Sequence, residues 1–339
     1  MSKFWNFRIS VTQFSWLLLL LVFASHMAFS QGFEPVNESA TWKITTDSVF
    51  DEEGNPANPY ITELFSKLFH DNEKEPRFSI EEFQQLLERP ESQEVYTNRL
   101  IKYATPKSKA IQDSAHINYA NVLMREAKIQ EGVDFLNKHR DLFDRVEQKY
   151  GVPRKDIVSI LMWESSLGKY SGDYRTFNIF MQQLLFLDKA QKFSVDEMLE
   201  FGEINEAEAD SLLVANSNRL DKLKKRAIKG LVALLKHCKE QGMDPLEQRG
   251  SWGGAIGYVQ FMPFNLHLAV DGDGDGIIDL NSWPDAVFSV ANYLKNYGRY
   301  GASHQARRRG IFSYNPINTY VNGVIKYADA VWKRYTNES

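Results

Sequence analysis

Helical periodicity runs through most of this chain, whereas strand signals are scarce. Between residues 60 and 147 apolar side chains recur at spacings of three and four, as in Ile61, Leu64, Phe65 and Leu68, which is the pattern of a single helix face. No stretch alternates valine, isoleucine and threonine on both sides of a hairpin turn, as a strand pair would. The sequence therefore predicts a mainly α fold.

Individual helices can be placed from local signals. Ser79, followed three residues later by Glu82, forms the capping-box pattern that predicts the start of a helix. Further helices are expected over residues 130–150, 206–240 and 321–335, the second of these as one long helix or two.

The N-terminal segment has the composition of a signal peptide. Lys3 and Arg8 supply positive charge, and the apolar run over residues 16–23 is shorter than the roughly 20 residues of a membrane-spanning helix. Small residues at Ala28 and Ser30 predict cleavage after Ser30, with an uncleaved membrane anchor as the alternative. No cysteine lies near this point to carry a lipid, so we expect an exported, periplasmic protein.

Charge and cysteine content exclude other classes of function. Removing residues 1–30 takes two positive charges from a chain of net charge −4 and leaves −6. A mildly acidic chain has no basic face suited to nucleic acid. The single cysteine, Cys238, excludes an internal disulfide, and its apolar helical surroundings favour a small core residue over a reactive thiol.

One carboxylate falls on an apolar helix face. The helix expected over residues 154–168 would bury Ile157, Ile160 and Leu161, and Glu164 follows them by seven, four and three positions, so it shares their face. Burial disfavours the charged form of a carboxylate and raises its pKa, which is what a general acid near neutral pH requires. The alternatives are a glutamate paired with an arginine, or a helix rotated enough to expose it.

Two later segments have side chains suited to a sugar. Residues 250–263 contain four glycines mixed with aromatic residues and Gln260; glycine lets the backbone approach a ligand closely. Residues 313–320 contain Tyr314 and Tyr320 and precede the last helix. Taken alone, the first segment could be an irregular packed turn, and the two tyrosines could be ordinary core residues.

Together and in this order, these segments resemble the family B lytic transglycosylases. The likeness runs from about residue 60 to the end of the chain. The matching pieces are Tyr150-Gly-Val-Pro153, Glu164-Ser-Ser-Leu-Gly168, Gly250-Ser251 through Gln260-Phe-Met-Pro263, Ser289-Val-Ala-Asn-Tyr293, Ser313-Tyr-Asn315 and Tyr320-Val321.

The resemblance implies a fold and a domain organisation. Members have a lysozyme-like α-helical catalytic core, an additional N-terminal helical subdomain and an EF-hand-like loop. The expected parts are a signal peptide at 1–30, a flexible segment at 31–57 and a lytic transglycosylase domain at 58–339, divided into an N-terminal helical part at 58–147 and a catalytic core at 148–339 with an insertion at about 193–218.

The resemblance also implies a reaction. Family members cut the bond between N-acetylmuramic acid and N-acetylglucosamine in peptidoglycan without adding water and without a cofactor. Glu164 matches the catalytic glutamate, which protonates the leaving oxygen and then takes a proton from the C6 hydroxyl, giving a 1,6-anhydro end. No second carboxylate occurs in the other two segments, although two-carboxylate glycosidases need one. Positions that line the family's groove correspond to Ser251, Tyr258, Gln260, Tyr314, Asn315 and Tyr320.

Two other functions stay open at this stage. A hydrolytic lysozyme on the same fold would give reducing ends instead of anhydro ends. A non-catalytic peptidoglycan-binding protein would have little reason to bury Glu164. Peptidoglycan strands are the expected partner in every case, and other cell-wall enzymes are further candidates.

An acidic loop has the spacing of a calcium site. Counting Asp271 as loop position 1, side-chain oxygens fall at positions 1, 3, 5 and 9, a glycine falls at position 6, and position 7 would offer its backbone carbonyl, as in a calcium-binding loop. The resemblance supports a structural calcium ion here. Position 12 is Ser282 in place of the expected acid, and Asp285 lies three residues further on. An acidic turn held by its own backbone and a sodium site are the alternatives. The predicted ligands are Asp271, Asp273, Asp275, Ile277 and Asp279.

The sequence departs from the family in two places. After Phe186 the family has a Pro-Arg-Arg run that faces the glycan, whereas this chain continues Leu-Asp-Lys-Ala-Gln-Lys192 into the insertion, for which a lid is one interpretation. The second departure lies between Tyr297 and Ser313, where some members carry a longer insertion and this chain has only a short basic piece at residues 299–309. That piece could contact the acidic stem peptides of peptidoglycan or could be a solvated loop.

Overall fold

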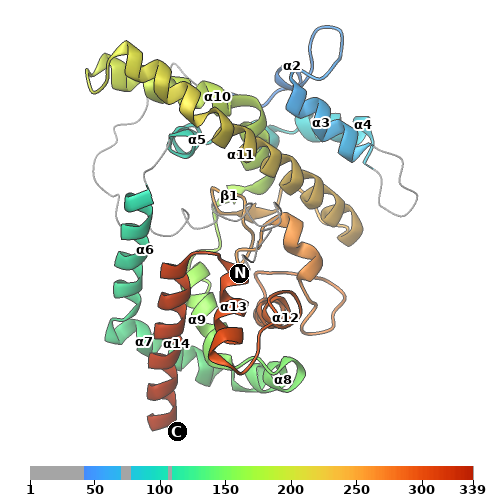
Figure 1. Ribbon diagram of the computed structural model, residues 1–339. Helices are drawn as coiled ribbons and strands as arrows, with labels where there is room; N and C mark the ends of the chain where they lie inside the picture. Colours follow the sequence, from blue (N-terminus) through green and yellow to red (C-terminus); the bar gives the residue numbers. More distant parts are fainter. Residues whose placement is uncertain (1–41, 70–77, 106–108, 339) are drawn as a thin grey trace, which may run out of the picture. The chain divides into compact units, whose positions relative to one another are not determined.

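Helices dominate the computed structural model, which describes residues 42–69, 78–105 and 109–338 (Figure 1). The predicted mainly α fold is confirmed. Paired strands are limited, in those ranges, to β1 (Tyr174–Arg175) and the antiparallel β2 (Arg249–Gly250). None of the described helices is long and apolar enough to cross a membrane. The predicted signal peptide lies outside the described residues.

The chain divides into two compact units. Unit 1 comprises the described parts of 112–163 and 290–338, and unit 2 those of 42–111 and 164–289. This division differs from the expected boundary at residue 148, because the last helices of the chain join a segment from its middle.

Unit 2 is built around two long helices. Its elements are α2 (Thr46–Val49), α3 (Pro59–Leu68), α4 (Ile80–Glu88), η4 (Pro90–Ser92), α5 (Thr97–Ala104), β1, α10 (Thr176–Glu200), α11 (Glu206–Gln241), β2, η5 (Pro263–Leu268) and most of α12 (Trp283–Asn292).

Unit 1 surrounds the helix that leads to Glu164. Its elements are most of α6 (Lys109–Leu123), α7 (Glu126–Lys138), α8 (Arg140–Tyr150), most of α9 (Arg154–Ser165), the π turn η6 (Tyr293–Tyr297), α13 (His304–Tyr314) and α14 (Asn318–Glu338).

Capping and close packing define α10 and α11. The Asn205 side chain accepts from the Glu208 N–H and the Glu208 side chain accepts from the Asn205 N–H, while the left-handed Gly242 (φ 64°) ends α11, so the predicted 206–240 segment is one helix. At Gly230 a Cβ atom would lie 2.5 Å from Cζ of Phe180, so only glycine allows this approach. Both helices therefore pack closely along the core of unit 2.

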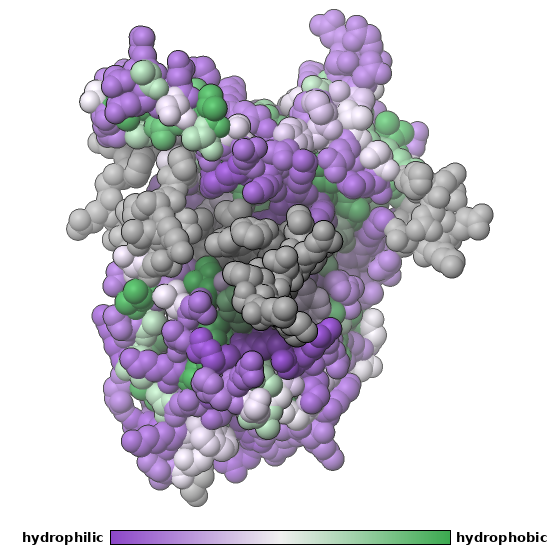
Figure 2. Space-filling model, in the orientation of Figure 1, coloured by the Kyte–Doolittle hydropathy of each residue, from purple (hydrophilic) through white to green (hydrophobic). Residues whose placement is uncertain are grey.

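The expected insertion at 193–218 forms the distal ends of α10 and α11 and the turn between them. This end of the helical pair, the yellow ribbon in Figure 1, has a largely hydrophilic surface with apolar residues among it (Figure 2). Phe201 and Val214 are 76% and 73% exposed. The segment is thus a continuation of the two helices.

The segment expected to be flexible is partly packed into unit 2. Residues 31–41 lie outside the described part, but Trp42, Ile44, Val49 and Phe50 are all buried, and Thr45 caps the short α2. Because these apolar residues are spread through a polar stretch with no clear period, the sequence did not show that they join the core.

The helix α9 is buried on all sides rather than along a stripe. Every residue from Ile157 to Trp163 has no exposed surface. The Trp163 ring meets Tyr119 and Tyr320 edge-on, with centroids 5.2 and 5.0 Å away, and a Cβ atom at Gly323 would lie 2.3 Å from that ring. The close approach of α14 thus depends on a glycine.

A buried ion-pair network fixes the first turn of α9 within unit 1. Asp156 is completely buried and accepts hydrogen bonds from the Tyr300 hydroxyl and from Arg307, whose Nη2 lies 2.6 Å from Oδ1. Arg307 also donates to Asp329 at 3.0 Å. Burial opposes the charge on Arg307, but Asp156 and Asp329 outweigh it and raise the pKa of the guanidinium. The start of α13 is therefore tied to the helix that leads to Glu164.

Candidate active site

Glu164 is a buried carboxylate at the end of α9, with 6% of its surface exposed. The chain then turns through three left-handed residues, Ser166 (φ 50°), Leu167 (φ 54°) and Gly168 (φ 77°). Left-handed geometry is unfavourable for the first two, and such strain persists where the surrounding structure enforces it, often at functional sites. The position of Glu164 is therefore closely constrained.

The glycine-rich segment of unit 2 packs against this turn. The Nε2 atom of Gln260 donates to the carbonyl oxygen of Ser171 at 3.0 Å. A Cβ atom at Gly172 would lie 2.0 Å from the Gly250 backbone carbon, and one at Gly168 3.1 Å from the Tyr258 ring. The structure thus brings the Glu164 turn together with the segment that contains Tyr258 and Gln260.

Gln260 has a free acceptor beside this turn. Its backbone is left-handed (φ 51°), it is 3% exposed, and its Nε2 also donates to the Gly257 carbonyl oxygen at 2.9 Å. Its Oε1 has no hydrogen-bond partner among the described residues. A buried polar atom left unpaired is costly, so Gln260 is suited to receive a donor from a ligand.

Ser251 and Tyr258 are held by their own segment. The Ser251 Oγ accepts from the Ala255 N–H at 3.1 Å, and the residue is 4% exposed. Tyr258 stacks on Trp283 with ring centroids 4.2 Å apart. Sequence reasoning missed Trp283, because a tryptophan after the acidic loop has no signal that separates it from core packing.

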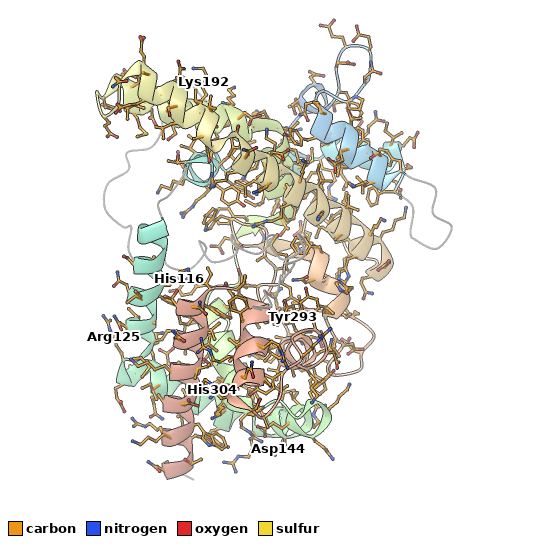
Figure 3. The ribbon with its side chains drawn as sticks, viewed as in Figure 1. His116, Arg125, Asp144, Lys192, Tyr293 and His304 are labelled. Carbon is orange, nitrogen blue, oxygen red and sulfur yellow. The ribbon has the colours of Figure 1, made fainter. Side chains whose placement is uncertain are left out.

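The other three predicted sugar-binding residues belong to unit 1. Tyr314 packs against Tyr293, labelled in Figure 3, at 4.8 Å between centroids. Asn315 is 2% exposed and, within the described residues, its Oδ1 has no hydrogen-bond partner. Tyr320 has no exposed surface and packs on Trp163. Asn315 therefore resembles Gln260 in offering a buried, unpaired acceptor, whereas Tyr320 is a core residue in this structure.

The acidic loop gathers three carboxylates, but not the predicted set. Oxygen atoms of Asp271, Asp273 and Asp285 lie within 4.8 Å of one another. Asp285 is 2% exposed and accepts N–H groups of Gly272 and Asp279, both at 2.7 Å. Its burial raises the pKa of its carboxyl, the two N–H groups lower it, and Asp273 and Asp271 raise it again. Asp285, three residues after Ser282 at loop position 12, thus brings a carboxylate to the cluster.

Two of the other predicted ligands, Asp275 and Asp279, accept backbone N–H groups of their own loop. The Oδ1 atom of Asp275 accepts the N–H of Ile277 at 2.7 Å, and that of Asp279 accepts the N–H of Asn281 at 2.9 Å. These bonds are those of an acidic turn held by its own backbone, the alternative considered from the sequence. The acidic cluster thus contains Asp271 and Asp273 of the predicted ligands together with Asp285, and it does not include Asp275 or Asp279.

Comparison with known proteins assigns the chain to a family. The family described as the transglycosylase SLT domain matches residues 63–309. Membrane-bound lytic murein transglycosylase B of Escherichia coli (strain K12) is 30% identical over 187 residues, which cover 55% of this chain and 43% of that protein. The match thus spans less than half the length of this curated relative.

Solved structures show the same fold. Soluble lytic transglycosylase SltB1 from Pseudomonas aeruginosa superposes with a TM-score of 0.59 at 23% identity, covering 81% of this chain and 99% of SltB1. The Escherichia coli lytic transglycosylase Slt35, in complex with calcium, superposes with a TM-score of 0.59 at 21% identity, covering 90% of this chain and 100% of Slt35. The predicted resemblance in fold is confirmed, and with the family match over most of its length the chain belongs to the transglycosylase SLT domain family.

Proposed function

We propose that this protein is a peptidoglycan lytic transglycosylase that uses Glu164 as acid and then as base. The observation that carries the proposal is the buried carboxylate of Glu164, followed by a strained left-handed turn against which the glycine-rich segment packs. Membership of the transglycosylase family supports it, as does the lytic murein transglycosylase activity named for the Escherichia coli relative.

The proposed reaction needs one carboxyl group. Protonated Glu164 gives its proton to the glycosidic oxygen as the C1–O4 bond between muramic acid and glucosamine breaks. The resulting carboxylate takes the proton of the muramic acid C6 hydroxyl, and O6 bonds to C1 to close the 1,6-anhydro ring. No water is consumed, and Glu164 ends protonated as it began.

The substrate contacts follow from the unpaired acceptors. Gln260 Oε1 and Asn315 Oδ1 can each accept a hydroxyl or acetamido N–H group of a sugar, and the exposed part of Tyr258 offers an aromatic face. Ser251 and Tyr314 are further predicted contacts, whereas Tyr320, which has no exposed surface, would act only by packing on Trp163.

A product assay separates the proposed reaction from its alternatives. Purified peptidoglycan is digested and the soluble muropeptides are analysed by mass. We expect anhydro-muropeptides, each lighter by one water than the corresponding reducing product. Reducing ends alone would assign the protein as a hydrolytic lysozyme, and sedimentation with peptidoglycan without any cleavage would assign it as a non-catalytic binder.

The acidic loop is proposed to hold a structural calcium ion. Asp271, Asp273 and Asp285 place three carboxylates within 4.8 Å of one another, and oxygen-rich clusters of this kind suit calcium. Slt35, which has the same fold, forms a complex with calcium. Asp275, the Ile277 carbonyl and Asp279 would complete the coordination, and the ion would brace the segment between the glycine-rich loop and α12 without entering the reaction.

We further propose export to the periplasm after cleavage of residues 1–30. The basic, apolar and small-residue order of this segment supports the proposal, as does a substrate that lies outside the cytoplasm. N-terminal sequencing of the mature protein should begin at Gln31, and an intact N-terminus in the membrane fraction would contradict this.

A further inference from the structure

Trp283, the first residue of α12, joins three segments of unit 2. Its ring stacks on that of Tyr258 with centroids 4.2 Å apart and an interplanar angle of 29°. A Cβ atom at Gly168 would lie 2.8 Å from Cζ2 and 2.9 Å from Cη2 of the same tryptophan ring. The turn after Glu164 therefore packs directly on Trp283, and only glycine allows this approach.

The part of the turn that contacts Trp283 is one hydrogen bond away from the residue next to Glu164. The Gly168 N–H donates to Oγ of Ser165 at 3.0 Å, and the Tyr170 N–H donates to the Ser165 carbonyl oxygen at 3.0 Å. Both bonds close the turn onto the last residue of α9. Because this turn has a strained left-handed backbone, neighbouring contacts have to hold it, and Trp283 supplies one of them.

The backbone on either side of this ring stack is tied to the acidic loop. Asp285, two residues after Trp283, accepts the N–H of Gly272 near the start of the loop at 2.7 Å. Near its end, the Leu280 carbonyl oxygen accepts the N–H of Tyr258 at 2.9 Å. Both members of the ring stack are therefore anchored by the same loop, and the turn after Glu164 rests on that stack.

We propose that Trp283 is a positioning residue of the active site, which holds the Glu164 turn in place and links it to the acidic loop. This inference rests on the proposed function. A displacement of about 1 Å in a catalytic group can cost about 10²-fold in rate, so support for the turn affects the chemical step. Because Trp283 acts through Gly168 and Tyr258, its loss should lower kcat more than it raises KM.

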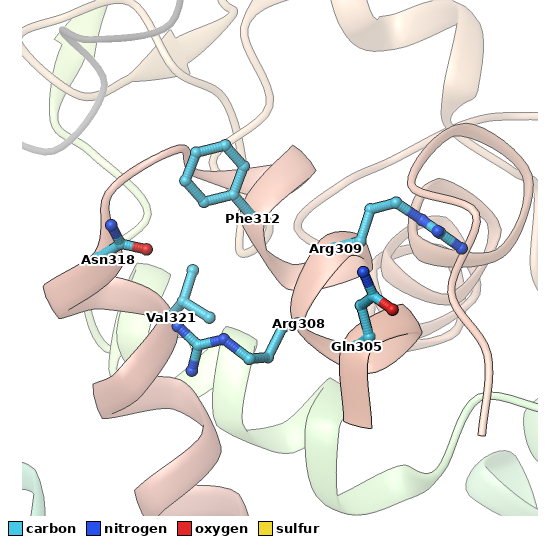
Figure 4. A pocket seen from close by; sticks show the side chains of 6 residues that line it. All are labelled: Gln305, Arg308, Arg309, Phe312, Asn318 and Val321. Carbon is cyan, nitrogen blue, oxygen red and sulfur yellow. The ribbon is translucent and has the colours of Figure 1, made fainter. Parts of the chain in front are cut away.

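The pocket shown in Figure 4 is a separate feature of unit 1. It has a volume of about 340 Å³, and its six lining residues all belong to α13 and α14. Trp283 borders no part of this pocket, and the role proposed for it needs no ligand there. Its effect should come through packing on Gly168 and Tyr258 alone.

The first test separates kcat from KM on soluble glycan strands, with each rate expressed per folded molecule. We expect Trp283→Ala to lower kcat about 10²-fold with a smaller change in KM, and Trp283→Phe, which keeps an aromatic face, to recover part of the loss. Trp332→Ala is the matched control and should keep the wild-type kcat. Trp332 also stacks on a tyrosine, Tyr335 at 5.6 Å between centroids, but it belongs to unit 1.

The second test measures hydrogen exchange of the peptide over residues 165–172 by mass, without substrate. Because the N–H groups of Gly168 and Tyr170 are hydrogen-bonded in the turn, we expect slow exchange in the wild type and in Trp332→Ala, and exchange about tenfold faster in Trp283→Ala.

Unchanged exchange or an unchanged kcat in Trp283→Ala would overturn the positioning role. If that variant does not fold, Trp283→Leu is compared with Trp283→Phe, and equal exchange and equal kcat in these two would overturn it. Absence of cleavage by the wild type would overturn the proposed function instead, and the exchange comparison would still decide whether Trp283 holds the turn.

Discussion

Strained single residues occur in the turn that follows the proposed catalytic carboxylate and in the segment packed against that turn. Ser166, Leu167 and Gln260 are three of the four non-glycine residues with positive φ in the described part of the chain. All three belong to the turn after Glu164 or to the segment packed against it. Strain of about 1–3 kcal/mol at such residues is retained where neighbouring contacts determine the backbone, which is consistent with a site that requires fixed geometry.

Gln260 gives a prediction at this scale. Replacing Gln260 with Ala removes two donated hydrogen bonds and the free acceptor, so we expect the free energy of unfolding to fall by about 1–2 kcal/mol. The rate of peptidoglycan cleavage per folded molecule should also fall, because the free acceptor for the substrate is lost. The control is Gln248→Ala, which removes one hydrogen bond from the side-chain amide to the Asp244 carbonyl oxygen. An equal fall in turnover for both variants would contradict the assignment of Gln260 as a substrate contact.

Cys238 gives a second prediction. It is 1% exposed, and burial, with a smaller effect of Asp244, raises the pKa of its thiol to about 12. Because the thiolate is the reactive form, we expect no labelling by a thiol reagent at pH 8 in the native protein and full labelling after unfolding. Rapid labelling of the native protein would show that the helix opens there.

Single residues were the most predictable part of this molecule. Glu164 is buried as predicted, although α9 is buried on all sides and not only on the face of Ile157 and Leu161. The capping box at Ser79 is present as predicted, with Ser79 Oγ accepting from the Glu82 N–H at 3.1 Å. The role of Asp285 was not predictable, because its approach to Asp271 depends on the path of the intervening loop. Trp163 and Trp283 carried no local signal at all.

At the scale of elements, helix α9 is held by contacts from distant parts of the chain. Its first turn is tied through Asp156 to Arg307 on α13, and its middle through Ser159, whose hydroxyl donates to the Val324 carbonyl of α14 at 2.7 Å. A catalytic group at the end of a helix anchored in this way has little freedom to move.

Breaking the Asp156 pair should destabilise the fold. We expect Arg307→Met to lower the free energy of unfolding in urea by about 3–5 kcal/mol, because it leaves Asp156 buried without its cation. The adjacent Arg308→Met is the matched control and should stay within about 0.5 kcal/mol of the wild type. Equal values for the two variants would show that the pair contributes nothing.

Element boundaries were predicted less well than element types. The expected helix at 130–150 is two helices separated at His139, while the segment at 206–240 is one helix of 36 residues. The piece at 299–309, considered as a solvated loop, instead begins α13 at His304. The ends of α11 and the start of α13 depend on caps such as Asn205, Gly242 and Ser303, which apolar periodicity alone does not report.

At the scale of the whole molecule, the order of motifs predicted the fold, but composition did not predict the two units. Residues 112–163 join 290–338 in one unit through contacts such as Trp163 with Tyr320, across more than a hundred residues of chain. The acidic loop lies in the other unit, where its effect on stability can be measured directly.

Calcium should stabilise the folded protein. A ligand present at 100 times its Kd adds about 2.7 kcal/mol, so we expect millimolar calcium to raise the Tm and a chelator to lower it. Asp273→Asn, which removes one carboxylate of the cluster, should reduce this shift, whereas Asp196→Asn on the exposed surface of α10 should not. A Tm that is the same with calcium and with chelator would contradict the metal site.

The most direct test of the account is digestion of peptidoglycan by Glu164→Gln beside the wild type. Loss of general acid and base catalysis costs about 10²–10⁴-fold in rate, so we predict abundant anhydro-muropeptides from the wild type and almost none from the variant. The Tm of the variant should be no lower than that of the wild type, because the amide has the same shape and removes a buried acid. Equal yields of anhydro-muropeptides from the two proteins would contradict the assignment of Glu164.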